Sequence, residues 1–180
     1  MGTLPAAGAG GRIRAWLLDW LVILAWVALT AVAGAGLWLA GLRLGPVGLN
    51  LTATVSVVLP ACVGFALLEA GPAQATWGKR RHGLRVVRAA DGGRVGLGRA
   101  MVRNLIKIGV SWSLGHAVAI ALATGSHWSA GLGLATVLAY GLPALFVLML
   151  ILPGHRPPYD LVAGTVVVAR SGEGPSVSRR

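Results

Sequence analysis

Four long apolar segments constrain this chain more than any other feature of its sequence. They cover about residues 15–40, 47–68, 104–123 and 132–152. A helix needs about 20 apolar residues to cross the hydrocarbon core of a bilayer, and each segment reaches that length. The sequence therefore predicts an all-α membrane protein with about four transmembrane helices.

Composition excludes the main soluble alternatives. Hydrophobic residues make up 56% of the 180-residue chain and charged residues only 12%, whereas soluble domains carry about 25% charged residues. A disordered chain would need low hydrophobicity. The single cysteine, Cys62, excludes an intrachain disulfide. The histidines lack the spacing of metal ligands, so we expect neither a metal site nor a cofactor.

The first apolar segment has a second interpretation, because it lies near the N-terminus. Arg12 and Arg14 resemble the basic end of a signal peptide, and residues 31–33 resemble a cleavage triplet. A charged residue inside the apolar core, Asp19, and the continuation of the apolar run favour a membrane span instead. We expect residues 1–11 to be flexible and residues 169–180 to form a disordered basic tail.

Pro60 interrupts the second apolar segment. A proline has no N–H, so the carbonyl of Ser56, four residues earlier, loses its helical partner. In lipid that carbonyl must be satisfied by a neighbouring group or by a hydroxyl such as that of Ser56 itself.

Two polar residues, Lys107 and His116, interrupt the third apolar segment. They are nine residues apart, which places them on opposite faces of a regular α-helix. We therefore expect His116 to be a buried side chain that hydrogen-bonds Ser113 or a neighbouring helix, rather than a proton relay.

The distribution of basic residues predicts the topology. They concentrate before the first segment, in the loop 71–103 and after the fourth segment, whereas the two other loops contain only Arg43. Loops rich in Lys and Arg stay in the cytoplasm. We therefore expect both termini and the loop 71–103 to be cytoplasmic. This placement explains the net charge of +11 without nucleic acid.

The cytoplasmic loop 71–103 contains signs of ordered structure. The strand-like sequence 84–87, an Asp-Gly turn at 90–93 and a second short strand around Val95 predict a β-hairpin. An amphipathic helix follows, and the C-terminal sequence 164–170 is a candidate third strand. Basic residues of this loop are expected to bind anionic lipid head groups.

Five charged residues lie within or beside the apolar segments, near their predicted cytoplasmic ends: Arg12, Asp19, Glu69, Lys107 and Asp160. Arg12 and Asp19 are two helical turns apart and so share a face. Charged groups at membrane depth turn toward the bundle interior or water. We therefore expect one polar cluster. Three interpretations of it remain open: a set of structural ion pairs including Arg12 with Asp19, a proton- or cation-handling site, or a lipid head-group site.

Three separated motifs now reveal a family resemblance. They are Arg12, Ala15 and Asp19; then Thr76, Gly78, Lys79, Arg80 and Gly83, with Arg103 before the third segment; and last the sequence 160–168 that begins with Asp160. Over residues 12–168 the chain resembles the RDD family of small bacterial membrane proteins. That family often has His before the last Asp, where this chain has Tyr159, so no role of that His carries over.

The resemblance implies an RDD-type transmembrane domain in a bacterial inner membrane, in a family for which cation/proton antiport has been suggested. We find no nucleophile–base pair and no phosphate-binding loop, so we expect no catalytic residues and no enzyme. Two hypotheses remain. The first is a transporter of a cation or proton-coupled solute that uses Asp19 and Asp160; four helices make a thin conduit, so transport would require a homo-oligomer. The second is a non-transporting scaffold that binds lipid or a partner through its basic loop.

Overall fold

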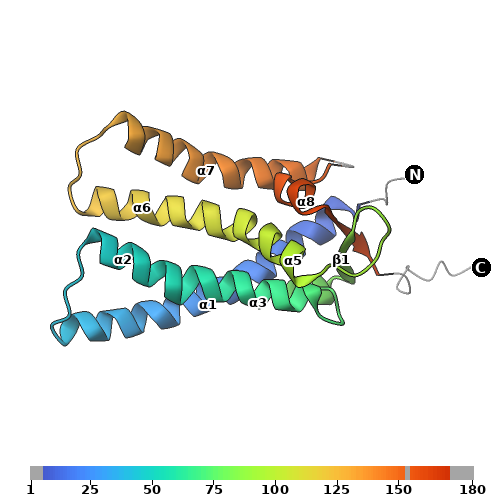
Figure 1. Ribbon diagram of the computed structural model, residues 1–180, viewed down its shortest axis with the longest axis horizontal. Coiled ribbons are helices and arrows are strands. Elements are labelled where there is room, and N and C mark those ends of the chain that lie inside the picture. Colours follow the sequence, from blue (N-terminus) through green and yellow to red (C-terminus); the bar gives the residue numbers. More distant parts are fainter. Residues whose placement is uncertain (1–5, 153–154, 171–180) are drawn as a thin grey trace, which may run out of the picture.

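The computed structural model describes residues 6–152 and 155–170. It is a bundle of long helices with a small sheet and short helices gathered at one end, which we call the sheet end (Figure 1). In chain order the elements are α1 (Ala9–Leu39), α2 (Pro46–Ala53), η1 (Thr54–Val58), α3 (Leu59–Ala70), α4 (Trp77–Arg81), β1 (Leu84–Arg88), α5 (Leu97–Asn104), η2 (Leu105–Val110), α6 (Ser111–Ala123), α7 (Ala130–Ile151), α8 (Pro158–Ala163) and β2 (Thr165–Ala169).

Four helical segments are long and apolar enough to cross a membrane. They are Ala9–Leu39, Pro46–Ala70, Leu97–Ala123 and Ala130–Ile151. The second joins α2, η1 and α3, and the third joins α5, η2 and α6; η1 and η2 are π-helical stretches with wider turns. The predicted fold class, a mostly helical membrane protein with four spans and a small β element, is confirmed.

Two of the helices begin earlier than the apolar segments suggested. α1 begins at Ala9, so the expectation of a flexible stretch is wrong for residues 9–11. Its start is held by the sheet, because the N–H of Ala7 donates to the carbonyl of Val167 at 2.8 Å. The third span begins at Leu97, since the amphipathic helix α5 continues into it without a break.

The candidate strand at 164–170 is confirmed as a partner of the first strand, whereas the hairpin predicted within the loop is largely absent. β1 pairs antiparallel with β2, from Leu84 opposite Ala169 to Arg88 opposite Thr165, whereas the expected hairpin is reduced to one isolated bridge between Val87 and Arg94. The turn between the two halves is held by a side chain, because Asp91 accepts hydrogen bonds from Gly93 N–H and Arg88 Nε. The C-terminal sequence supplies the main strand.

β2 also limits the predicted C-terminal tail. The strand extends to Ala169, and the N–H of the next residue, Arg170, donates to the carbonyl of Gly83 at 2.7 Å. The expected disorder is therefore wrong for 169–170. The rest of the predicted tail, 171–180, lies outside the described residues.

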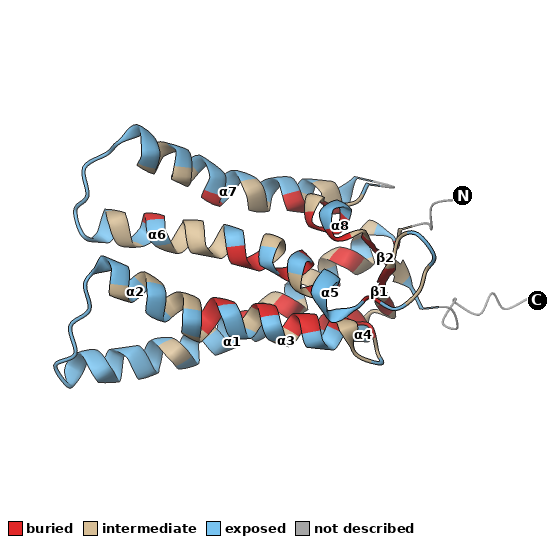
Figure 2. Cartoon of the chain, in the orientation of Figure 1, coloured by how far each residue is buried: buried red, intermediate tan, exposed pale blue. Residues whose placement is uncertain are grey.

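Burial is concentrated toward the sheet end (Figure 2). There the small residues Ala15, Ala66 and Ala100 pack against the strand residues Val86 and Val167. The far half of the bundle exposes large apolar side chains, which lipid rather than protein would cover. The structural core of the protein is therefore at the sheet end.

The unpaired carbonyl created by Pro60 is satisfied from α1. Trp26 Nε1 donates a hydrogen bond of 2.8 Å to the carbonyl of Ser56. The prediction that a neighbouring group supplies this hydrogen bond is confirmed. The contact also joins the first and second spans midway along their length.

A double-mutant cycle tests this contact. We expect Trp26→Phe to lower the free energy of unfolding by about 1 kcal/mol, because it removes the only N–H of that side chain. In the Pro60→Ala background the cost should be smaller, since the new N–H at position 60 donates to Ser56. Unfolding in detergent measures both costs, and equal costs in the two backgrounds would contradict the assignment.

Candidate functional site

Five buried side chains at the sheet end alternate in charge and form a continuous series of ion pairs, which we call the ion chain: Asp19, Lys79, Glu69, Arg103 and Asp160. Lys79 Nζ lies 3.4 Å from Asp19 and 3.0 Å from Glu69. Arg103 lies 2.6 Å from Glu69 and 2.7 Å from Asp160. These residues come from α1, α4, α3, α5 and α8, so the ion chain joins five elements.

Helical periodicity places Asp19 in the interior. The buried residues of α1 are Arg12, Ala15, Asp19 and Ile23, which recur at the three- and four-residue spacing of one helical face. The rest of α1 is largely exposed and apolar. A single buried stripe on a lipid-exposed helix therefore carries the acidic residue to the ion chain.

Glu69 is the centre of the ion chain. Its side chain is fully buried at the end of α3. One carboxylate oxygen accepts hydrogen bonds from Lys79 and Arg103, and the other accepts one of 2.9 Å from Asn104 Nδ2. A buried carboxylate is tolerated when such partners replace its hydration.

Asp19 is held by three donors from one short segment. Thr76 Oγ1 donates at 2.6 Å, the N–H of Gly78 at 2.9 Å, and Lys79 Nζ at 3.4 Å. The Thr-x-Gly-Lys motif of the loop is therefore a binding loop for the carboxylate of α1. The sequence identifies these residues as a loop motif but does not predict that they bind Asp19.

Gly78 lies too close to α1 to carry a side chain. A Cβ atom at this position would lie 2.2 Å from the carbonyl oxygen of Ala15 and 2.8 Å from Asp19 Oδ1. Real Cβ atoms do not approach a backbone oxygen so closely. The glycine therefore allows α4 to approach α1 and present its N–H to the carboxylate.

The last carboxylate of the ion chain, Asp160, lies in α8. It accepts hydrogen bonds from Arg103 Nε and Thr165 Oγ1. The neighbouring Tyr159 packs its ring 5.2 Å from the Arg103 guanidinium and 5.1 Å from the ring of Phe146. Burial, with the nearby charge of Asp160, raises the pKa of Tyr159, so the phenol stays neutral at ordinary pH.

Arg12 belongs to the same face as Asp19 but does not pair with it. Its guanidinium donates to the carbonyls of Leu150 and His155, at 2.9 and 3.2 Å. The expected pairing of Arg12 with Asp19 is wrong, because Lys79 from the loop pairs with the carboxylate instead. Arg12 instead joins α1 to the end of α7, where helix carbonyls lack helical partners.

Two other loop-motif residues, Arg80 and Gly83, shape the backbone of the loop. Arg80 is exposed, and its Nε donates to the carbonyl of Ala75 at 3.2 Å. Gly83 connects α4 to β1 with a φ of 60°, the left-handed region in which glycine is favoured.

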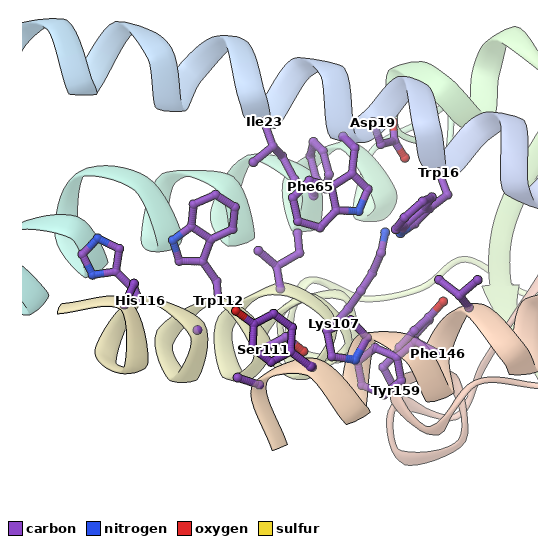
Figure 3. A pocket seen from close by; sticks show the side chains of 18 residues that line it. Trp16, Asp19, Ile23, Phe65, Lys107, Ser111, Trp112, His116, Phe146 and Tyr159 are labelled. Atoms are coloured by element: carbon purple, nitrogen blue, oxygen red, sulfur yellow. The ribbon is translucent and has the colours of Figure 1, made fainter. Parts of the chain in front are cut away.

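A cavity of about 420 Å³ adjoins the ion chain (Figure 3). It is lined by residues of α1, α3, η2, α6, α7 and α8, and most of them are apolar or aromatic. The ring of Trp20 meets Trp16 edge-on at 5.8 Å and stacks on Trp112 at 5.9 Å. Of the three carboxylates in the ion chain, only Asp19 also lines the cavity.

Lys107 lies in the cavity wall rather than in the ion chain. It extends from η2 toward α1, and its Nζ lies 5.8 Å from the centre of the Phe65 ring (Figure 3). Within the described part of the chain it makes no ion pair. The polar cluster expected from the sequence therefore divides into a paired network and an unpaired cation beside it.

His116 lines the same cavity as Lys107, so the prediction of opposite faces is wrong. The reason is the π-helical stretch η2, which begins before Lys107 and ends before His116. One extra residue in a turn rotates the following helix by about 100° relative to a regular α-helix. The predicted bond to a neighbouring helix is confirmed, because His116 Nδ1 lies 3.4 Å from Asn50 Oδ1 of α2.

No obvious metal site is present among residues 6–152 and 155–170, where no three His, Cys, Asp or Glu side chains gather. The buried thiol of Cys62 lies 3.5 Å from the carbonyl of Asn104, to which it donates. The chemistry that the site offers is therefore charge pairing, hydrogen bonding and apolar contact.

The sequence model of the RDD family matches residues 6–164. The chain belongs to the RDD family. Comparisons with curated proteins and with solved structures give no significant match. In this RDD-family protein, the motif residues Asp19, Lys79, Arg103 and Asp160 are the ones that form the ion chain with Glu69.

A pair of glycine substitutions tests the close contact between α4 and α1. We expect Gly78→Ala to lower the free energy of unfolding by about 1–3 kcal/mol, because the methyl group overlaps the Ala15 carbonyl. Gly98→Ala is the matched control, since a Cβ there meets nothing within 4 Å and lies in helix α5. Thermal unfolding in detergent measures both, and equal stability of the two variants would contradict the packing.

Proposed function

We propose that this RDD-family protein is a transporter of a proton-coupled solute and not an enzyme. The observation that carries the proposal is the cavity of about 420 Å³ within the bundle, whose lining includes a carboxylate of the ion chain. Transporter sites lie near the middle of the bilayer and are formed between helices, often beside irregular helical turns. The cavity shares two of these features, because it lies between helices and the π-helical stretch η2 forms part of its wall.

The charges of the cavity favour an organic solute over a metal cation. A cation entering the cavity would meet the ammonium group of Lys107. Both oxygens of Asp19 already accept hydrogen bonds from protein donors. A solute that carries no positive charge avoids this repulsion and gains apolar contacts with the aromatic wall.

Asp19 is the residue that would couple the cavity to a proton. Its negative charge attracts Lys79 and so holds α4 against α1. Protonation would remove that attraction and loosen the contact at the sheet end, while leaving the Lys79–Glu69 pair in place. Intramembrane carboxylates serve this purpose in proton-driven transporters.

We place the sheet end in the cytoplasm of a bacterial cell, with the spans in the inner membrane. The exposed arginines near this end support that orientation: Arg14, Arg80, Arg81, Arg94 and Arg99. Their charge also supports contact with anionic head groups of the inner leaflet. A homo-oligomer would widen the path that four helices enclose.

Proteoliposomes loaded with a pH-sensitive dye test the proposal. We expect a gradient of hexanesulfonate, an organic anion with an apolar chain, to change the internal pH in proportion to the protein present. A sulfonate stays ionised and does not cross lipid as a neutral acid, so this pH change requires the protein. Gradients of NaCl, KCl and LiCl should give no more than protein-free liposomes. Asp19→Asn should lower the hexanesulfonate response at least about tenfold. An amide cannot take up and release the proton that is proposed to move with the solute.

Asp91→Asn is the matched control, because Asp91 is an exposed carboxylate that does not line the cavity. It should transport like the wild type. If no gradient changes the pH, the protein is better explained as a scaffold that acts through its basic surface. A response driven by an alkali cation would overturn the preference for an organic solute.

A further inference from the structure

We infer that the cavity binds a single-chain anionic amphiphile, with its acidic head group at Lys107 and its apolar chain among the aromatic side chains. The inference rests on the proposed function only in taking the cavity as the solute site. It specifies the solute class, and it concerns binding, which is measured without flux.

The head-group position follows from the unpaired charge of Lys107. Its nearest acidic neighbours in the ion chain, Asp19 and Glu69, are already paired with Lys79. Within the described residues the Lys107 side chain has no hydrogen bond and no ion pair, and its Nζ faces the Phe65 ring. The three carboxylates of the ion chain outnumber its two cations, so Lys107 balances the charge of the cluster without an acidic group within 4.0 Å of its Nζ. An anionic head group in the cavity would give this ammonium group the direct partner that it lacks at membrane depth.

A second polar group lies beside this cation. Ser111, four residues after Lys107, also lines the cavity. Its Oγ is buried and has no hydrogen-bond partner in the part of the chain that is described. A buried hydroxyl without a partner is rare in folded proteins. An acidic head group between Lys107 and Ser111 would give both of them a partner.

The rest of the cavity suits an apolar chain. Trp20 and Trp112 stack on one another in the lining. Ile23, Phe65 and Phe146 add further apolar surface to the wall (Figure 3). The volume of about 420 Å³ lies within the range of about 300–1,000 Å³ that is typical of small-molecule sites. A ligand with one charged end and one apolar end matches both parts of this lining.

The ligand has a route from the bilayer. Tyr140 of α7 lines the cavity and is 72% exposed, so the cavity reaches the surface of the bundle there. α7 is one of the four candidate spans, so this part of the surface lies at the depth of the lipid chains. An amphiphile dissolved in the membrane therefore reaches the cavity laterally, without crossing the sheet end.

Tryptophan fluorescence tests the inference with the full-length protein in nanodiscs of neutral phosphatidylcholine. The probe is 9,10-dibromostearate, whose bromine atoms quench tryptophans close to the bound chain. We expect saturable quenching by the carboxylate and only a linear, non-saturable component from its uncharged methyl ester. Lys107→Gln should weaken the saturable binding at least about tenfold, and Lys107→Arg should retain it.

A second pair of variants changes the volume of the cavity and not its charge. Gly115 lines the cavity and has open space around it, so Gly115→Leu should fill part of the site and weaken binding. Gly141→Leu, at an equally open position of α7 outside the lining, should bind like the wild type.

Three outcomes would overturn the inference. They are equal saturable binding of acid and ester, binding that is unchanged in folded Lys107→Gln protein, and stronger saturable quenching by dibrominated phosphatidylglycerol than by the single-chain acid. Saturable binding of dibromostearate without hexanesulfonate flux would retain the ligand site and refute transport. Flux without this binding would refute the ligand assignment alone.

Discussion

The fold depends on the buried carboxylate of Glu69 and on the two cations that it brings together. A single oxygen of this residue accepts from both Lys79 and Arg103, which in turn reach Asp19 and Asp160. Every link is buried, so each charge depends on its neighbours for the stabilisation that water would otherwise give. The three spans and two short helices that supply these residues are therefore held at the sheet end by one interaction network.

This network explains why the two ends of the bundle differ. At the sheet end small residues and strands pack tightly around the ion chain, whereas the far half presents apolar side chains outward. There the helices are joined by isolated contacts such as that from Trp26 to Ser56. The cavity adjoins the ion chain, and its lining includes Tyr140, which is exposed.

Periodicity and hydropathy were sufficient to predict the four spans, the buried face that carries Asp19 and the unpaired carbonyl at Ser56. They could not predict the partners of Asp19, because Thr76, Gly78 and Lys79 are distant in sequence and act through the shape of a loop. The shared cavity of Lys107 and His116 was missed because a π-helical turn changes the phase of the helix. Likewise, the local turn sequence favoured a hairpin, whereas in the structure β1 pairs with β2, which is distant in sequence.

The free energy of unfolding of Glu69→Gln tests most directly whether the ion chain holds the fold together. The substitution keeps the size of the side chain and removes the charge that Lys79 and Arg103 share. We expect a loss of about 3–5 kcal/mol, the cost of leaving buried charges without their partner. Asp91→Asn should cost no more than about 1 kcal/mol, because it removes only an exposed ion pair and keeps an oxygen that accepts the hydrogen bonds of the turn. A Glu69→Gln protein as stable as the wild type would contradict the central role of this carboxylate.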